Sequence, residues 1–260
     1  TFLGLLSAPW PIRAADANWR PDPDSAYCAR CAAQVGPHEV AGNPPACSAC
    51  RDARLPWSHA VRLGAWTGPL RTAILEAKYA RSRRLAFDLG IQLGHTLARH
   101  LRAADLNPAD AALLPIPMSL QRRWTRGLDH TLAIARGVRA VTASQIRRPL
   151  RRRHRPAQAS LPESGREANA RGSFLPRSGE PVAGYAALIV LDDVRTTGAT
   201  LRAACRAIQA RERRLGGRLG ANQVWVATLA VVTPNERRPL RGTNSEGEQD
   251  SREGDESLIA

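Results

Sequence analysis

The most chemically informative stretch of this chain is residues 192–200, which read DDVRTTGAT. A loop over its last five residues would direct several backbone N–H groups toward one point, and Gly198 would let a ligand approach the backbone closely. Threonine hydroxyls add donors, so the loop is a candidate phosphate-binding site. The candidate contacts are Thr196, Thr197, Gly198, Ala199 and Thr200. The adjacent carboxylates of Asp192 and Asp193 would repel phosphate and need another partner, such as a ribose diol or Mg2+.

The residues on either side predict the elements that would hold this loop. Residues 185–191 (YAALIVL) are short, apolar and rich in branched side chains, which is typical of a parallel strand covered on both faces. Residues 201–214 repeat apolar side chains at helical spacing, so a helix is expected to begin near Ala199. The two aspartates could instead cap that helix, because Asp is a common N-cap. Two adjacent acids beside a threonine-rich glycine loop favour ligand binding over the cap.

Four cysteines form a second candidate site. Cys28, Cys31, Cys47 and Cys50 make two C-x2-C pairs with fifteen residues between them, which is the spacing of ribbon-type zinc sites. Glycine and proline between the pairs favour turns over a packed core, so metal is expected to supply folding energy. Four thiolates leave no open position, and the predicted zinc is therefore structural. Two disulfides are the alternative, which the cytosolic character of the rest disfavours. Cys205 is expected to be a small buried residue.

Two further segments offer groups that suit an anion. Residues 111–117 (AALLPIP) predict a short strand that ends in a tight turn, and Arg122, Arg123 and Arg126 follow at once. Residues 147–155 are rich in arginine and lead into a polar stretch through residue 164, which is typical of a mobile loop that closes over a ligand. A solvated surface loop is the alternative for this second segment.

Lys78 is the only lysine among the 38 Lys and Arg residues. A chain that uses arginine almost everywhere indicates that this position requires a compact ammonium group, although chance remains the alternative. Lys78 lies near the end of a predicted helix at 69–79, which a second helix at 84–101 follows. A third helix is expected at 127–141 and a last strand at 224–232.

The string LIVLDDVRTTGATL resembles the 5-phosphoribosyl-1-pyrophosphate (PRPP) motif of the type I phosphoribosyltransferases. In that family the acidic pair holds the ribose hydroxyls and the TTGAT loop binds the 5′-phosphate. The resemblance implies that Asp192 and Asp193 fix the ribose, with Asp193 as a candidate proton acceptor.

Residues 27–232 as a whole resemble the ComF family, a zinc-ribbon module fused to a phosphoribosyltransferase domain and associated with competence for DNA uptake. Besides the paired cysteines, the resemblance rests on WTGPLRTAILEAKY (66–79), LLPIPMSLQRRWTRG (113–127) and LRRRHRPAQASLPESGREANARGSF (150–174). It implies that the turn after the strand at 111–117 cradles pyrophosphate and that Arg153 is catalytic. The other implied ligand contacts are Pro115, Ile116, Pro117, Met118, Lys78, Arg126, Gln158, Arg166 and Asn169. The family usually reads RGFNQ where residues 126–130 read RGLDH, which leaves the roles of Asp129 and His130 open.

The length and the charge of the chain limit its possible domain organisation and its partners. The chain of 260 residues can hold one enzyme-sized domain and a small module. The expected division is an N-terminal apolar segment at 1–20, a zinc-ribbon-like module at 21–56, a phosphoribosyltransferase domain at 57–234 and a disordered tail at 235–260. Residues 1–12 are interpreted as a trimmed start or packing helix, and without a run of ~20 apolar residues we expect a cytoplasmic protein without a membrane partner. The formal charge of +15 predicts weak, salt-sensitive attraction to DNA.

Together these features predict an α/β protein of the type I phosphoribosyltransferase fold, a central parallel sheet flanked by helices, with a small N-terminal zinc-ribbon-like domain. The predicted function is transfer of phosphoribosyl from PRPP, bound with Mg2+, to a nitrogenous acceptor, in a protein linked to DNA uptake. The alternative is a non-catalytic adaptor that binds PRPP or a nucleotide and handles single-stranded DNA or a replication or recombination protein. With six Trp, three Tyr and three Phe, the chain supplies few side chains for base stacking. The acceptor and the oligomeric state stay open.

Overall fold

The structure of the chain, a computed structural model, describes residues 8–43, 45–80, 82–118, 129–153, 172–179, 181–220 and 222–232. Four of the candidate ligand contacts lie outside these residues: Arg126, Gln158, Arg166 and Asn169. The predicted tail at 235–260 also lies outside them.

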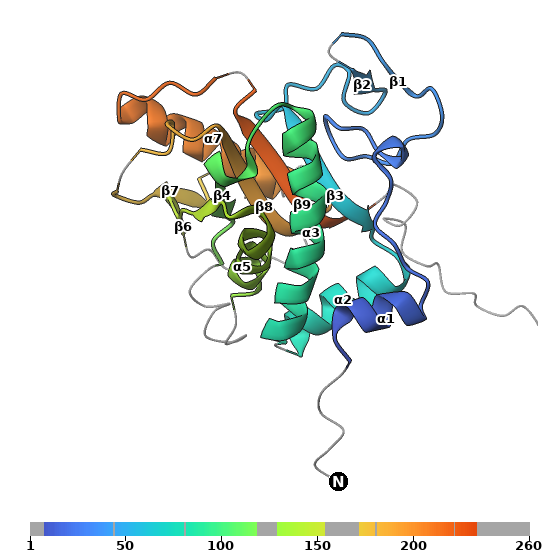
Figure 1. Cartoon of the computed structure of the whole chain (residues 1–260). Helices are drawn as coiled ribbons and strands as arrows, with labels where there is room; N and C mark the ends of the chain where they lie inside the picture. Colours follow the sequence, from blue (N-terminus) through green and yellow to red (C-terminus); the bar gives the residue numbers. More distant parts are fainter. Residues whose placement is uncertain are drawn as a thin grey trace, which may run out of the picture.

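A five-stranded parallel sheet forms the centre of the molecule (Figure 1). Its order is β3-β9-β8-β4-β5. The strands are β3 (His59–Ala65), β4 (Ala111–Pro115), β5 (Gln145–Ile146), β8 (Ala187–Arg195) and β9 (Val224–Val231). The chain leaves β4 toward β5 at one edge, whereas it leaves β8 toward β9 on the other side. The strand order therefore reverses between β4 and β8, and the carboxyl ends of such a strand pair flank the crevice where α/β proteins bind ligands.

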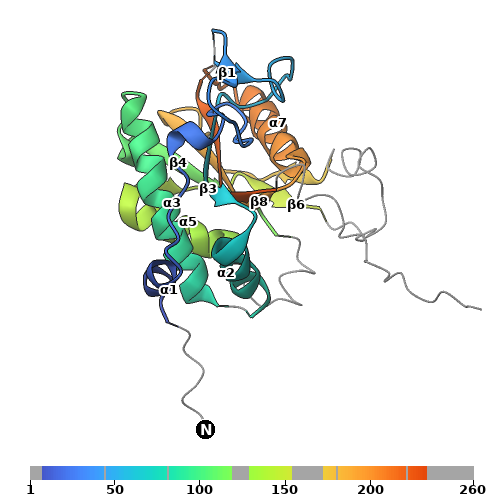
Figure 2. The ribbon, with the colours of Figure 1, turned by 90° about the vertical axis from the view of Figure 1, so that its right-hand side faces the viewer.

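Helices cover both faces of the sheet (Figure 2). One face packs against α1 (Trp10–Asp16), α2 (Gly68–Tyr79), α3 (Arg83–Ala103) and α5 (His130–Thr142), and the other against α7 (Ala199–Arg214). Alternate residues of β8 enter the two cores, Ile189 on the first face and Val190 on the second. This double burial explains the uninterrupted apolar run in the sequence. The predicted fold class is confirmed, and the architecture is consistent with a type I phosphoribosyltransferase-like fold.

Glycines let α3 and α5 pack closely. A Cβ on Gly90 would collide with the carbonyl oxygen of Ile134, and a Cβ on Gly137 would collide with that of Phe87. The two helices can therefore touch backbone to backbone. This contact fixes the position of α5, whose first residue, His130, lies at the carboxyl end of the sheet beside β8.

The remaining elements are short. The cysteine module, residues 27–56, contains the antiparallel pair β1 (Val40–Ala41) and β2 (Ala46–Cys47) and packs on the α7 face of the sheet. Strands β6 (Leu150–Arg152) and β7 (Phe174–Pro176) form a second antiparallel pair. Two 3-10 turns, Asp24–Ala26 and Pro108–Asp110, precede the module and β4. Among the described helices, none has both the length and the apolar character that crossing a membrane requires.

Candidate ligand site and metal centre

A cavity of about 150 Å³ lies at the carboxyl ends of β4 and β8, where the strand order reverses. It is lined by the ends of both strands, the last turn of α2, the first turns of α5 and α7, and β6. The lining residues are Lys78, Ile116, Pro117, Met118, His130, Thr131, Arg152, Asp192, Asp193, Val194 and Thr200. Seven of them were candidate site residues from the sequence, so segments far apart in the chain meet at one place.

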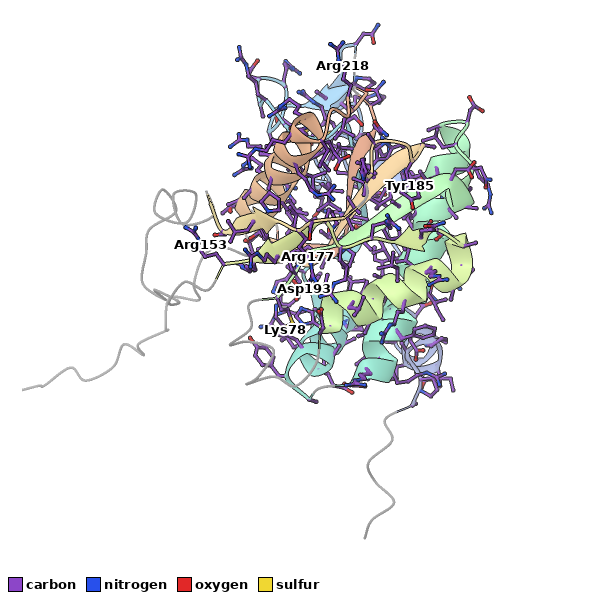
Figure 3. The ribbon with its side chains drawn as sticks, turned by 90° about the vertical axis from the view of Figure 1, so that its left-hand side faces the viewer. Lys78, Arg153, Arg177, Tyr185, Asp193 and Arg218 are labelled. Atoms are coloured by element: carbon purple, nitrogen blue, oxygen red, sulfur yellow. The ribbon has the colours of Figure 1, made fainter. Side chains whose placement is uncertain are left out.

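Asp193 is held from several sides. Its Oδ2 atom lies 2.7 Å from Nζ of Lys78 and 2.8 Å from Nε2 of His130, and Oδ1 accepts a hydrogen bond of 2.7 Å from the backbone N–H of Val194. Figure 3 shows Lys78 and Asp193 side by side at this end of the sheet. Both oxygens of Asp193 are therefore engaged with the protein itself, and the only lysine of the chain is one of the partners.

Asp192 is less constrained. Its Oδ1 accepts a hydrogen bond of 3.0 Å from the backbone N–H of Asp193, and its side chain forms no other hydrogen bond or ion pair among the described residues. The residue is half-buried and lines the cavity. Asp192 therefore keeps one carboxylate oxygen without a hydrogen-bond partner among the described residues, at the border of the cavity.

The two acids also differ in charge state. Burial, followed by the charge of Asp193, raises the pKa of Asp192 to about 7. Burial would raise the pKa of Asp193 too, but the hydrogen bond from His130 and the charge of Lys78 outweigh it and lower that pKa below its ordinary value. Asp193 is thus held ionised, whereas Asp192 is partly protonated near neutral pH.

His130 is one of four lining residues that the sequence did not assign, with Thr131, Arg152 and Val194. Its side chain is nearly buried, its Nε2 contacts Asp193, and its Nδ1 is buried without a hydrogen-bond partner in the described part of the chain. The neighbouring Asp129 has a local role, because its carboxylate caps α5 by accepting from the N–H of Leu132 at 3.1 Å. The only sequence signal for His130 was the departure from the ComF-like pattern at that position.

The candidate phosphate loop starts α7. Gly198 has φ of +78°, a left-handed conformation that favours glycine, and it is the N-cap residue of α7. Because glycine is the N-cap residue and the aspartates accept from the N–H groups of Asp193 and Val194 instead, the interpretation of the two aspartates as helix caps is wrong. Thr196 is exposed and Thr197 is half-buried, with its Oγ1 accepting from the N–H of Ala199 at 3.3 Å. The loop thus leaves hydroxyl groups and N–H groups near the helix N-terminus, next to the cavity that Thr200 lines.

A second, larger groove of about 830 Å³ adjoins the cavity and shares Pro117, Met118 and Arg152 with it. Its basic lining residues are Arg148, Arg151, Arg152, Arg153 and Arg177. Figure 3 shows Arg153 and Arg177 on the side of the sheet that carries β6 and β7. Among the described residues, no carboxylate forms an ion pair with Arg151, Arg153 or Arg177. The groove is therefore a strongly positive surface that starts at the predicted pyrophosphate turn.

Helix α7 anchors the segment that carries Arg177. The buried carboxylate of Glu212 accepts from the N–H groups of Val182 and Ala183 at 2.8 and 3.1 Å, and it pairs with Arg211. Arg211 in turn donates to the carbonyl of Arg177 at 3.1 Å. These buried charges are paired and hydrogen-bonded, as burial requires, and they fix the backbone of the groove rather than its side chains.

The four paired cysteines converge as the spacing predicted. Their Sγ atoms all lie within 4.8 Å of one another, with separations of 3.5 Å for Cys31 and Cys47 and 3.7 Å for Cys28 and Cys50. Metal–sulfur bonds of about 2.3 Å in a tetrahedron place sulfurs about 3.8 Å apart. All four thiols are free and buried, so they are positioned to bind a metal ion and are not paired in disulfides. Cys205 is free and fully buried on α7, as expected.

The remaining candidates lie near the cavity without lining it. Pro115 is the buried last residue of β4, and Arg153 belongs to the adjoining groove. The loop residues Thr196 to Ala199 lie between Val194 and Thr200, which do line the cavity.

Comparison with known proteins gives one informative similarity. The chain is 27% identical over 172 residues to DNA utilization protein YhgH of Salmonella typhi, an alignment that covers 62% of this chain and 70% of that protein. No protein-family model matches the chain.

Proposed function

We propose that the chain is a ComF-like phosphoribosyltransferase that binds PRPP with Mg2+ and transfers the phosphoribosyl group to a nitrogenous acceptor. The observation that carries this proposal is the convergence of the motif aspartates, the turn at 116–118 and Lys78 on one cavity at the strand-order reversal. By the resemblance to the ComF family, these groups would contact the ribose and the pyrophosphate of PRPP. The similarity to a DNA utilization protein adds support for a link to DNA uptake.

In the proposed reaction the bond from C1 of the ribose to pyrophosphate breaks, its electron pair leaves with the pyrophosphate, a bond forms from C1 to the acceptor nitrogen, and the proton of that nitrogen passes to water. Positive charge builds on the ribose ring and negative charge on the leaving group. Arg152, which lines the cavity beside the turn at 116–118, would stabilise that negative charge. The loop at 196–200 would hold the 5′-phosphate and so keep the ribose aligned with both partners.

The two acids would have different roles in the site. Asp192 offers its open carboxylate oxygen to a ribose hydroxyl, whereas Asp193 orients Lys78 and His130 around the same space. A carboxylate with a pKa below its ordinary value is a weak base near neutral pH, so the proton-acceptor role predicted for Asp193 does not enter this mechanism.

The proposed metals have separate places. Mg2+ would be held by the pyrophosphate together with an oxygen ligand such as Asp192, and when bound it supplies charge neutralisation on the leaving group. Zinc would be held by the four cysteines and would be structural, because four thiolates leave no open position for a substrate.

A pyrophosphate-release assay tests the proposal. The metal-loaded chain is incubated with PRPP, Mg2+ and a pool of purine and pyrimidine bases, alongside the variants Asp192→Ala and Asp16→Ala. Asp16 is an exposed aspartate at the end of α1 and serves as the matched control. We expect acceptor-dependent release from the wild type and from Asp16→Ala, with at least a tenfold loss in Asp192→Ala. Release that is unchanged in Asp192→Ala would contradict the assignment of the site.

The second candidate function is the adaptor that handles single-stranded DNA, which the arginine groove favours. The guanidinium groups of Arg151, Arg153 and Arg177, which form no ion pair with a carboxylate among the described residues, suit a phosphate backbone. Fluorescence anisotropy with a labelled oligonucleotide would compare the double variant Arg151→Ala, Arg177→Ala with Arg218→Ala, an exposed arginine far from the groove in Figure 3. The adaptor function would be supported if the groove variant alone bound DNA more weakly. The slope of its log affinity against log salt concentration should then also decrease by about two, one for each lost phosphate contact. Equal binding by both variants would remove the groove from DNA handling.

A further inference from the structure

The first cysteine knuckle, residues 28–32, is held by the sheet through four successive carbonyl groups. The backbone N–H of Ala60 donates to Ala29 at 2.7 Å, and the indole Nε1 of Trp57 donates to Arg30 at 3.0 Å. Nη1 of Arg195 donates to the carbonyl of Cys31, and Nη1 of Arg62 donates to that of Ala32 at 3.0 Å. The knuckle is therefore docked rigidly on the sheet, and one of its donors belongs to the PRPP-like motif.

Arg195 differs from the other donors because it also borders the phosphate loop. It is the last residue of β8, directly before Thr196, and its backbone is fixed by pairing with β9. A Cβ placed on Gly198 would lie 3.2 Å from Nε of Arg195 and 3.3 Å from Nη1 of Arg202. The guanidinium group of Arg195 thus lies against the loop at one side and against a metal-binding residue at the other.

We propose that Arg195 is a positioning residue that couples the metal-binding knuckle to the phosphate loop, so that metal retention and binding of a phosphate-bearing ribose strengthen each other. The inference rests on the proposed function for the identity of the ligand. With metal bound, Cys31 is fixed, its carbonyl fixes the Arg195 side chain, and the loop is preformed. Without metal, ordering of the knuckle and the loop must be added to the cost of binding the ligand. Coupling of two binding equilibria is reciprocal, so the ligand must raise the affinity for the metal by the same factor.

The matched control is Trp57. Its indole donates to the carbonyl of Arg30, next to Cys31 in the same knuckle, and among the described residues it forms no hydrogen bond with the phosphate loop. Trp57→Phe removes this hydrogen bond and keeps an aromatic ring. It therefore loosens the knuckle without interrupting the path from Cys31 to the loop.

The experiment measures the zinc affinity of the full chain by equilibrium competition with a chromophoric chelator, with and without ribose 5-phosphate, together with the Kd of ribose 5-phosphate by calorimetry. We expect ribose 5-phosphate to raise the zinc affinity about tenfold in the wild type, within the range typical of coupled sites. In Arg195→Met this protection of the bound zinc should fall to less than twofold and the Kd of ribose 5-phosphate should rise about tenfold. Arg195→Lys, which can still donate to the Cys31 carbonyl, should restore part of both effects. Trp57→Phe should bind zinc more weakly but keep the full protection by the ligand.

The outcomes separate this inference from the proposed function. Wild-type chain that binds ribose 5-phosphate with no change in zinc affinity contradicts the coupling alone. The inference is overturned if Arg195→Met and Arg195→Lys both keep the full protection of bound zinc by the ligand. It is also overturned if Trp57→Phe loses as much protection as Arg195→Met, because Arg195 would then have a merely structural role. Failure of the wild type to bind ribose 5-phosphate or PRPP contradicts the proposed function and the coupling together.

Discussion

The cysteine cluster and the acid-pair cavity are built in opposite ways. The cluster joins four identical ligand atoms, all of them buried and close enough to share one ion, with no lining residue left over for a substrate. The cavity joins unlike groups from several helices and strands around open space. Four identical metal ligands with no open coordination position stabilise a fold. A cavity lined by different side chains can instead offer some of them to a bound molecule.

The inequality is clearest within the aspartate pair. Both carboxylate oxygens of Asp193 contact other groups of the protein, whereas Asp192 keeps one oxygen without a hydrogen-bond partner among the described residues. The two neighbouring residues therefore have different roles: Asp193 positions other side chains of the site, and Asp192 is placed to contact a ligand. The variants below test whether the cluster and the cavity, and then the two acids, differ as the structure indicates.

The largest effect is expected from breaking the cysteine cluster. Cys31→Ser should reduce bound zinc from about one ion per chain to almost none and lower the midpoint of thermal unfolding, because metal binding supplies folding energy in such modules. Metal content by atomic spectroscopy and calorimetric unfolding check this. Cys205→Ser is the control, since Cys205 is equally buried but lies far from the other thiols in sequence and on α7. Stoichiometric zinc in Cys31→Ser would contradict the closed four-cysteine site.

The next effect separates the two acids. Asp193→Asn leaves Lys78 and His130 without their carboxylate, so it should lower the free energy of unfolding by about 1–3 kcal/mol and also weaken PRPP binding. Asp192→Asn should weaken PRPP binding at least tenfold without lowering the free energy of unfolding, because burial and the charge of Asp193 disfavour the ionised form of Asp192. Urea unfolding and calorimetric titration give the two quantities for each variant. Equal losses of stability in both would mean that the acids are equivalent.

A smaller effect concerns the contacts between α3, the start of β3 and the residues at the beginning of the cysteine module. Nε2 of His59 lies 3.2 Å from Nδ1 of His100, whose Nε2 lies 3.0 Å from Asp24 and 2.9 Å from the hydroxyl of Tyr27. Arg99 pairs with the same aspartate. Burial first, and then the neighbouring His100, lowers the pKa of His59 to about 4, and burial also lowers the pKa of His100.

The folded chain therefore binds fewer protons at His59 than the unfolded chain between about pH 6.5 and 4. The free energy of unfolding should fall as the pH drops through this window, by about 1–3 kcal/mol from this residue. Urea unfolding at several pH values checks the slope, and His59→Gln should flatten it. The same slope in the variant would show that other groups cause the acid sensitivity.

The smallest effect is expected from the conservative change His130→Gln. His130→Gln keeps a donor toward Asp193, so PRPP affinity should fall less than about fivefold, whereas His130→Ala removes the donor and should cost at least tenfold. Calorimetric titration of both variants measures the difference. Equal affinities for wild type, His130→Gln and His130→Ala would exclude His130 from the site.

Much of this architecture could be predicted from the sequence, because its strongest signals are local. The helix after the phosphate loop was expected from Ala199 to residue 214, and α7 spans Ala199–Arg214. Strand β8 was expected to end at residue 191 but continues to Arg195, because pairing with β9 outweighs the low strand preference of aspartate. Strand β3 was not predicted, since Arg62 interrupts its apolar run. The structure buries Arg62 by pairing it with Asp22 at 2.7 Å.

The site itself was only partly predictable. Motif spacing indicated the aspartates, the loop and the cysteines, and the unusual lysine indicated Lys78. No sequence pattern indicated that Lys78 and His130 share one carboxylate oxygen, because the contact depends on how α2 and α5 pack against the sheet. The hydrogen bond from Arg195 to Cys31 joins residues 164 positions apart and was equally invisible.

The most direct test of the central claim is a calorimetric titration of the zinc-loaded chain with PRPP and Mg2+, compared with the variant Gly198→Val. Gly198 has a positive φ that valine rarely adopts, so the substitution should distort the phosphate loop and leave the rest of the sheet intact. We predict one PRPP bound per wild-type chain and at least tenfold weaker binding in the variant. No binding to the wild type, or equal binding to both, would contradict a PRPP site at residues 192–200.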